Sequence, residues 1–294
     1  MRIAITGSTG FVGTTLINEF PEIQSLLKPS SANITSNSLT KDNISIEKVD
    51  CIVHLAAQSN VAASLDHPYD TINTNVLGTL RILEILKEKK FTGRFLYVSS
   101  GDIYGKGNDP INEDSPPNLT NPYSVSKYTS EQLIKSLEDS FPFDTLIARP
   151  FNHIGPGQSP SFAISCWAKQ VAQMMHGKRE PVLTVGNISV ERNFTDVRDT
   201  IRAYFKILET AQRGEVFNIC SEKNIALNEV ISFLKELSGI DFKVEQDPNL
   251  FRPNDYSTPP ISNSKITKLG WTPRYQIDKT LGDILNYWEK KVND

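Results

Sequence analysis

The two residues best suited to take part in a chemical reaction are Tyr123 and Lys127. They lie four positions apart in the segment Tyr123-Ser124-Val125-Ser126-Lys127. On a helix this spacing puts both side chains on one face, one turn from each other. A nearby ammonium favours the phenolate and lowers the pKa of a tyrosine from its ordinary value of ~10. The pair therefore predicts a tyrosine that transfers protons near neutral pH. An isolated pair of this kind, however, more often lies on the solvated surface of a protein and has no catalytic role.

The chain around Tyr123 indicates a helix that follows a strand. Pro122 suits the first turn of a helix, where its missing N–H is not needed. Residues 94–100 form a largely apolar run that indicates a strand and ends in Ser99 and Ser100. Because ligands bind at the carboxyl ends of the strands in a parallel α/β sheet, Ser100 is expected at the ligand-binding edge.

The N-terminal segment 3–17 indicates a buried strand, a glycine-rich turn and a helix. Its glycines, Gly7, Gly10 and Gly13, follow a Gly-x-x-Gly-x-x-Gly spacing. Such a turn lets a pyrophosphate approach the main chain at a helix N-terminus, where free N–H groups and the helix dipole favour an anion. A glycine triplet alone is weak, but its place between strand and helix predicts a dinucleotide-binding loop rather than a purely structural turn.

The region expected to bind the adenosine ribose of the dinucleotide has no acidic side chain. Residues 23–41 contain neither Asp nor Glu and instead include Lys28, Ser30 and Ser31. An acid here would accept a hydrogen bond from the ribose 2′-hydroxyl, whereas a lysine with two hydroxyls suits a 2′-phosphate. The segment therefore predicts NADPH as the cofactor, with NADH as the alternative if Lys28 is a solvated loop residue.

A further buried strand is predicted within residues 49–58. It ends in Leu55 and the small residues Ala56 and Ala57, which leave room for a flat cofactor against the backbone. His54 is predicted to be a packed strand residue rather than a catalyst.

Length and composition narrow the class of protein. The chain has 294 residues, 38% of them hydrophobic and 22% charged, with a net charge of -3, which predicts a soluble protein of one or two domains. It has no basic run typical of nucleic-acid binding and no apolar run of ~18 residues for a membrane span. The three cysteines are widely spaced, which predicts buried thiols rather than disulfides or a metal site. We expect a cytoplasmic protein without a metal.

Several motifs resemble those of the extended short-chain dehydrogenase/reductases that act on nucleotide sugars. The segments that carry the resemblance, in family order, are 7–13, 54–57, 75–79, 98–100, 104–105 and 122–127. The resemblance implies that Tyr123 is the acid/base at the sugar 4-position, that Ser100 bonds the same oxygen, and that Lys127 lowers the tyrosine pKa and holds the nicotinamide ribose. The implied cofactor contacts are Gly7, Thr9, Gly10, Phe11, Val12, Gly13, Lys28, Leu55, Ala56, Ala57, Asn75, Tyr123 and Lys127.

The later motifs are most similar to those of the GDP-4-keto-6-deoxy-D-mannose reductases. Segment 151–153 resembles both these reductases and the GDP-mannose 4,6-dehydratases, and segments 186–187, 191–199, 217–221, 251–253 and 269–273 recur in the reductases in this order. The resemblance implies reduction of the 4-keto group of a nucleotide-linked 6-deoxyhexulose by hydride from NAD(P)H. The implied substrate contacts are Ser100, Asp102, Asn152, Lys169, Asn187, Arg192 and Arg252, of which the cationic residues would neutralise the diphosphate.

Three alternatives remain open at this point. In the dehydratases a Glu two residues before a Tyr-Gly pair removes the proton at the sugar 5-position. Here Asp102 occupies that place, one methylene shorter, and Gly101 offers no neighbouring acid, so dehydration is predicted to be impaired. A 4-epimerase with tightly bound NAD is a second alternative, and a non-catalytic nucleotide-sugar binding protein is a third.

The predicted fold is α/β, a doubly wound parallel sheet of the Rossmann type with a smaller α/β cap domain that binds the substrate. Residues 1–150 and 193–221 are assigned to the NAD(P)-binding domain, and residues 151–182 and 224–294 to the cap. Helices are predicted over residues 70–90, 122–140 and 281–292, and no internal repeat is evident. As the family implies, the first two of these helices would pair in a homodimer.

Overall fold

The computed structural model describes residues 1–27, 39–107, 110–251 and 256–293. Its centre is a six-stranded sheet in the order β2-β1-β3-β4-β5-β9, and every neighbouring pair in it is parallel. The strands are β1 (Ile3–Thr6), β2 (Gln24–Ser25), β3 (Cys51–His54), β4 (Arg94–Val98), β5 (Asp144–Pro150) and β9 (Val216–Ile219). The strand order reverses beside β1, which is the arrangement of a doubly wound sheet.

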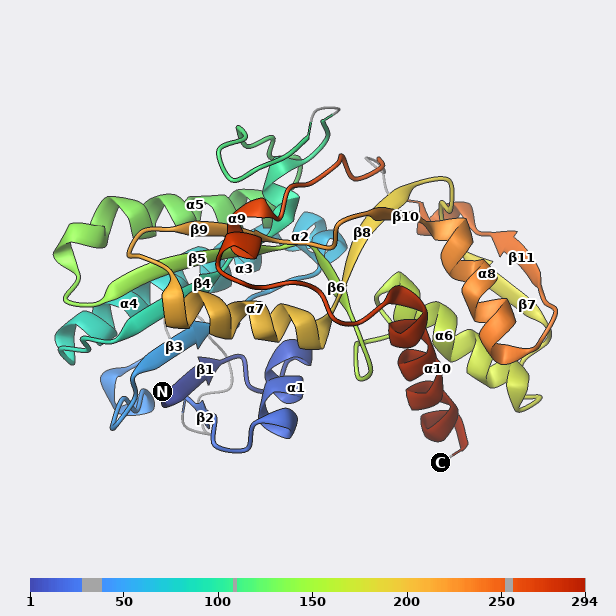
Figure 1. Ribbon diagram of the computed structural model, residues 1–294, viewed down its shortest axis with the longest axis horizontal. Coiled ribbons are helices and arrows are strands. Elements are labelled where there is room, and N and C mark those ends of the chain that lie inside the picture. The colour runs from blue at the N-terminus through green and yellow to red at the C-terminus, as the bar shows by residue number, and fades with distance from the viewer. Residues whose placement is uncertain (28–38, 108–109, 252–255, 294) are drawn as a thin grey trace.

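Helices cover both faces of this sheet (Figure 1). One face packs on α1 (Phe11–Glu19) and α7 (Val197–Thr210), and the other packs on α4 (Gly78–Glu88) and α5 (Pro122–Leu137). Successive strand residues alternate between the two cores, as Ile5 and Val53 face α7 while Ala4 and Ile52 face α4. Because both faces are covered, β1, β3, β4, β5 and β9 are mostly buried and largely apolar instead of alternating with exposed polar residues.

The sequence predicted one helix over residues 70–90. In the structure this region is α3 (Pro68–Ile72), a π-helical turn η3 (Asn73–Leu77) and α4, which follow one another without a break. A separate short helix, α2 (Val61–Asp66), precedes them. The predicted helix over residues 122–140 is α5 followed by a 3-10 turn, η5 (Glu138–Ser140). A short 3-10 turn, η2 (Lys41–Asn43), precedes β3.

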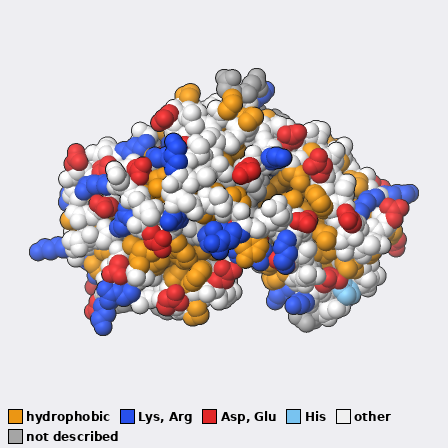
Figure 2. Space-filling model, viewed as in Figure 1, with side chains coloured by type: hydrophobic (Ala, Val, Ile, Leu, Met, Phe, Trp, Pro, Cys, Tyr) orange, Lys and Arg blue, Asp and Glu red, His pale blue; other side chains and the backbone are white. Residues whose placement is uncertain are grey.

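A second, smaller unit has its own hydrophobic core. It contains α6 (Ala163–Met175), β7 (Val182–Val185), α8 (Leu227–Ser238), β11 (Lys243–Gln246) and α10 (Ile277–Asn293), with β7 and β11 paired in parallel. Between the two units lies a three-stranded sheet, β10-β8-β6, formed by β6 (Asn152–Ile154), β8 (Glu191–Asp196) and β10 (Asn224–Ala226) (Figure 1). The space-filling view is notched at its lower edge, between the parts that hold α1 and α10 (Figure 2).

The packing after β11 differs from the sequence-based assignment of all residues 224–294 to the cap. A 3-10 turn, η6 (Pro248–Leu250), is followed by α9 (Ser264–Lys268), whose Ile266 is buried with Trp271 in the core beneath the large sheet, and the partly buried Leu269 packs against this core. The indole N–H of Trp271 donates to the carbonyl of Asp199 on α7 at 3.0 Å. These apolar side chains therefore pack with the sheet unit against α7, and the assignment of residues 224–294 to a substrate-binding cap stays a prediction.

Candidate active site

The helix that carries Tyr123 and Lys127 begins at a reciprocal cap. Asn121 Oδ1 accepts a hydrogen bond from the Ser124 N–H at 2.8 Å, and the Asn121 N–H donates to Ser124 Oγ at 3.3 Å. This capping box, with Pro122 in the first turn, fixes the point at which α5 starts. Tyr123 and Lys127 follow one turn apart and are 9% and 4% exposed. The predicted pair is therefore on one helix face, and that face is buried rather than solvated.

The ammonium of Lys127 is tied to the neighbouring strand. Its Nζ donates to the Val98 carbonyl at 2.7 Å and lies 5.0 Å from the centre of the Tyr97 ring, both on β4. Burial lowers the pKa of Lys127 to about 7, and the charge of Glu131 opposes this shift. Near neutral pH the lysine is therefore close to the midpoint of its titration.

The loop after β4 brings a second hydroxyl to Tyr123. Ser100 caps the 3-10 turn η4 (Gly101–Tyr104), with its Oγ accepting from the Asp102 N–H at 3.1 Å, and its side chain lies near enough to Tyr123 to oppose the rise in the pKa of that phenol. Asp102 Oδ2 accepts from Asn121 Nδ2 at 2.8 Å, so the carboxylate is held against the start of α5. The structure thus brings four predicted residues together: Ser100, Asp102, Tyr123 and Lys127.

The acidity of Tyr123 differs from the expectation. Burial raises the pKa of Tyr123 to about 12, a rise that the nearby Ser100 side chain opposes and the charge of Asp102 reinforces. The pKa of Tyr123 therefore lies above its ordinary value in this structure, because the buried phenolate would lose its hydration, and the effect of Lys127 on it stays a prediction. A phenol with this pKa stays protonated at neutral pH and is suited to donate its proton.

The glycine-rich loop has the shape of a phosphate cradle. Gly7 has a φ of +70°, and a Cβ there would lie 2.8 Å from the Ala56 nitrogen, so the chain passes too close to the end of β3 for any side chain. Gly10 caps α1 without a side-chain hydrogen bond, and the first turn carries no acid. The N–H groups of this turn are thus available to an anion, as a dinucleotide pyrophosphate requires. The residues present fit the cofactor that the family implies.

The cofactor residues predicted after β3 are half-buried, and Asn75 is buried behind them. The Ala56 N–H donates to Thr6 Oγ1 at 3.1 Å, which fixes this turn against β1. Asn75 Oδ1 accepts from the Gln58 N–H at 2.8 Å, and its Nδ2 donates to Ser126 Oγ on α5 at 2.9 Å. Asn75 therefore connects the turn after β3 to α5, and its role in cofactor binding stays a prediction.

His54 is packed, as the sequence predicted. Its Nδ1 lies 2.7 Å from Thr6 Oγ1 and its Nε2 lies 2.9 Å from Thr79 Oγ1. Burial lowers the pKa of His54 to about 3, and the charge of Lys127 adds to the effect. The imidazole is therefore an uncharged structural group between β1 and α4.

The second strand is too short to clamp a ribose by itself. β2 has two residues with exposed side chains, and Ser25 Oγ accepts a hydrogen bond from Ser8 Oγ of the glycine-rich loop at 3.2 Å. Lys28, the predicted contact for a 2′-phosphate, lies outside the described residues.

The predicted substrate residues are spread over several elements. Asn152 on β6 is exposed and donates from Nδ2 to the Asn193 carbonyl at 3.2 Å. Lys169 on α6 lies over the Trp288 ring, with Nζ 5.3 Å from its centre. This places Lys169 against α10 inside the cap, away from the cluster around Tyr123.

Two of the remaining predicted substrate residues, Asn187 and Arg192, lie just before β8 and on its second position. Asn187 Oδ1 accepts from the Ser189 N–H at 3.0 Å and from Ser189 Oγ at 2.7 Å. Arg192 donates to the carbonyls of Glu191 and Tyr256. Arg252 lies outside the described residues. No substrate role of these residues is established by these contacts, and each stays a prediction.

Sequence reasoning missed a buried charged network one turn beyond Lys127 on α5. Arg149 on β5 forms a two-pronged ion pair with Glu131 on α5 and donates to the hydroxyl of Tyr104 on η4 at 2.7 Å. The available signal was the spacing, since Glu131 lies one turn beyond Lys127 on the same helix face.

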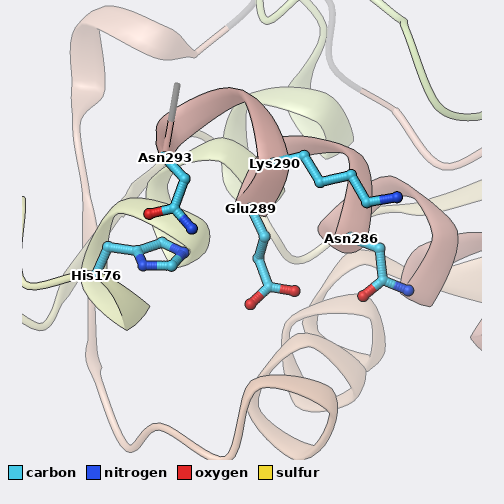
Figure 3. Close-up of a pocket in the computed structure, with 5 residues that line it drawn as sticks. All are labelled: His176, Asn286, Glu289, Lys290 and Asn293. Atoms are coloured by element: carbon cyan, nitrogen blue, oxygen red, sulfur yellow. The ribbon is translucent and has the colours of Figure 1, made fainter.

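The pocket drawn in Figure 3 lies away from these residues. It has a volume of about 410 Å³, opens at the surface, and is lined by His176 after α6 and by Asn286, Glu289, Lys290 and Asn293 of α10. None of the lining residues belongs to η4 or α5, so the pocket is not the catalytic site. Among the described residues no group of three or more His, Cys, Asp or Glu side chains could hold a metal, and no helix is both long and apolar enough to cross a membrane.

Comparison with known proteins agrees with this geometry. Residues 18–284 match the family described as GDP-mannose 4,6 dehydratase. GDP-6-deoxy-D-mannose reductase of Pseudomonas aeruginosa is 35% identical, over 100% of this chain and 99% of the relative. The dTDP-D-glucose 4,6-dehydratase of Mus musculus is 25% identical, over 100% of this chain and 90% of its own length.

Solved structures share the fold along the whole chain. The structure of RMD from Pseudomonas aeruginosa complexed with NADPH has a TM-score of 0.89 and 34% identity, and the match covers 99% of this chain and 100% of that chain. UDP-glucose 4-epimerase of Thermotoga maritima has a TM-score of 0.83 at 24% identity, over 99% and 100% of the two chains. The glycine cradle, the Ser100–Tyr123–Lys127 cluster and these matches show that the chain belongs to the GDP-mannose 4,6-dehydratase family, within the extended short-chain dehydrogenase/reductases of nucleotide sugars.

Proposed function

We propose that this enzyme reduces the 4-keto group of GDP-4-keto-6-deoxy-D-mannose to give a GDP-6-deoxyhexose. NADPH, when bound, supplies the hydride that forms the new C–H bond at the sugar 4-position. Tyr123 donates its phenolic proton to the former ketone oxygen, so that the product is the neutral alcohol. Ser100 bonds the same oxygen, and Lys127 holds the nicotinamide ribose. The observation that carries the proposal is that Tyr123 is buried beside Ser100, one turn before the buried Lys127 on the same face of α5.

Each residue has a role that follows from its surroundings. A ketone that accepts hydride becomes an alkoxide, and a preorganised donor at that oxygen stabilises the developing charge. The high pKa of Tyr123 keeps the proton in place until the alkoxide forms. After transfer, the phenolate would be stabilised by the hydrogen bond from Ser100 and by the ammonium of Lys127, and the proton would be regained from solvent.

The loop after β4 disfavours the dehydratase alternative. A Cβ at residue 101 would lie 2.6 Å from the Phe151 ring, so Gly101 cannot be replaced by an acid without moving that ring. The carboxylate of Asp102 is engaged by the Asn121 amide at 2.8 Å, and it is one methylene shorter than the Glu of a dehydratase. A base must come within ~3 Å of the proton that it removes. The hydrogen bond with Asn121 and the shorter side chain both keep the Asp102 carboxylate from reaching the proton at the sugar 5-position.

The cofactor and domain roles are part of this proposal. NADPH is favoured because the chain has no acid in residues 23–41 and because the related structure from Pseudomonas aeruginosa is complexed with NADPH, while NADH is the alternative. The sheet unit would bind the dinucleotide. The cap would bind the nucleotide sugar through Asn152, Lys169, Asn187, Arg192 and Arg252.

We also propose a homodimer. Large apolar side chains are exposed on α2, α3, η3 and α5, which contact one another: Leu65, Tyr69, Leu77 and Val125 are 51%, 77%, 43% and 38% exposed. Exposed apolar groups on adjacent helices are typical of a surface that a second copy covers. A cytoplasmic location stays a prediction.

The direct test is oxidation of NADPH, and separately of NADH, when purified protein is mixed with GDP-4-keto-6-deoxy-D-mannose made in place by a dehydratase. Rapid loss of the reduced cofactor with formation of a GDP-6-deoxyhexose is expected, and faster with NADPH. No loss with either cofactor would rule out this substrate. Tightly bound NAD in the purified protein would then favour an epimerase or a dehydratase.

A further inference from the structure

The ion pair between Arg149 and Glu131 is fully enclosed. Arg149 Nε donates to Glu131 Oε1 at 3.0 Å and Nη2 donates to Oε2 at 2.6 Å, with side chains that are 5% and 0% exposed. The desolvation of two such charges costs several kcal/mol per ion, and well-packed apolar residues often stabilise a protein as much or more. A pair of this kind is therefore not expected to add much to the stability of the fold. Its role is indicated by the elements that it connects.

The pair anchors the catalytic helix to the sheet. Glu131 lies one turn beyond Lys127 and two turns beyond Tyr123 on the same face of α5. Lys127 bonds to the Val98 carbonyl on β4, and Glu131 bonds to Arg149 on the adjacent strand β5. Two contacts one turn apart thus set how far α5 can slide along the two strands.

The same guanidinium reaches the loop that carries Ser100. Arg149 Nη1 donates to the Tyr104 hydroxyl at 2.7 Å, and that hydroxyl donates to Asn218 Oδ1 on β9 at 2.8 Å. Tyr104 ends the 3-10 turn that Ser100 begins. One side chain therefore connects the two elements, α5 and η4, that bring the hydroxyls of Tyr123 and Ser100 together.

We propose that Glu131 and Arg149 are positioning residues of the reduction, which set α5 and η4 in register so that Tyr123 and Ser100 meet one substrate oxygen, and which keep a carboxylate next to Lys127. The proposal rests on the reductase function proposed above. Glu131 touches neither Tyr123 nor a reacting atom, and it acts through the helix and through the charge of Lys127.

The charge effect has a definite sign. Lys127 faces Tyr123 and Glu131 on its own helix, the Tyr97 ring on β4 and the His54 imidazole on β3. Of these, His54 is uncharged at neutral pH, because burial holds its pKa at about 3. Glu131 is the group that opposes the loss of the proton from Lys127. Removal of its charge lowers the pKa of Lys127, so that the ammonium is lost at a lower pH.

The test compares Glu131→Gln, which keeps the shape but removes the charge, with Glu131→Asp, which keeps the charge but withdraws it by one methylene. Arg202→Gln is the control, because Arg202 also forms an ion pair with a buried carboxylate, that of Asp199 on α7, although its own side chain is 24% exposed, and neither residue belongs to the site. The measurements are kcat, both KM values, the unfolding midpoint, and the affinity for NADPH by fluorescence titration from mildly acidic to alkaline pH, a range that covers the pKa of Lys127 and its expected downward shift.

In the Glu131→Gln variant we expect kcat at neutral pH to fall about 10- to 100-fold, the scale of a small misplacement of reacting groups, with KM values within about threefold. The pH at which NADPH affinity falls should move down by about half a unit or more. In the Glu131→Asp variant the pH profile should stay near that of the wild type while kcat is reduced. Arg202→Gln should lower the unfolding midpoint alone.

The proposal is overturned if Glu131→Gln and Arg202→Gln both change the unfolding midpoint alone and leave kcat and the pH profiles as in the wild type. If Glu131→Gln does not fold, an unchanged kcat in Glu131→Asp overturns it equally. Failure of the proposed function is recognised separately, because wild-type protein would then not turn over the GDP-sugar, while the pH profile of NADPH affinity would still test the ion pair.

Discussion

Gly7 offers a test in which two physical costs can be separated. Its φ is +70°, and a Cβ would lie 2.8 Å from the nitrogen and 2.9 Å from the Cα of Ala56. An alanine at residue 7 therefore meets both a left-handed backbone and a backbone that cannot move aside. The first costs about 1–2 kcal/mol and the second, as overpacking, about 1–3 kcal/mol. The free energy of unfolding of Gly7→Ala should thus fall by about 2–5 kcal/mol.

The control is Gly177→Ala. Gly177 follows α6, has a φ of +64°, and a Cβ there would have no atom within 4 Å. It therefore carries the backbone cost alone, about 1–2 kcal/mol. The difference between the two variants measures the steric cost of the close approach between the first glycine and the turn after β3.

The assays are urea unfolding and fluorescence titration with NADPH. Gly177→Ala should bind NADPH like the wild type, whereas Gly7→Ala should bind at least about tenfold more weakly, because the phosphate cradle has to open to admit the methyl group. If the two variants lose the same unfolding free energy and both keep wild-type affinity, the contact between Gly7 and Ala56 is not tight in solution. The description of the loop as a cofactor cradle would then lose its support.

Three further predictions concern the catalytic pair and the exposed helices. Tyr123→Phe should abolish turnover while leaving NADPH affinity largely intact, and a variant with wild-type kcat would remove Tyr123 from the mechanism. Lys127→Met should be inactive yet more resistant to urea at pH 6 than the wild type. Burial lowers the folded pKa of Lys127 to about 7, so the unfolded chain holds more protons above that pH; stability of the wild type rises with pH there, and the advantage of the variant should shrink in alkali. Tyr69→Asp should convert the proposed dimer into a monomer in sedimentation experiments, while an unchanged mass would place the interface elsewhere.

Much of the site could be predicted from the sequence because its signals are local. A glycine triplet between a strand and a helix, and a Tyr–Lys pair four residues apart, depend on geometry within one turn of chain. The pKa of Tyr123 could not be predicted in the same way. It depends on how completely the folded protein excludes water from the phenol, and a spacing argument that counts only Lys127 gives the opposite direction.

The contacts that the sequence did not indicate are those between distant segments. Arg149 is followed by the recognised Phe-Asn-His motif, yet its partners Glu131 and Tyr104 are 18 and 45 residues away in the chain. Likewise Trp271 belongs to a motif that was assigned to the cap, and its indole bonds to Asp199, 72 residues earlier. A hydrophobic pattern indicates that such side chains are buried. It does not indicate which element of the fold they pack against.

The return of α9 and Trp271 to the sheet unit affects how the protein folds. The chain leaves the sheet after β5, returns at α7 and β9, leaves again for α8 and β11, and is bound to α7 once more before α10 closes the cap. Neither unit is a continuous stretch of chain, so neither can complete its core before most of the polypeptide has been synthesised. We expect one cooperative unfolding transition, without a stable fragment that corresponds to the cap alone.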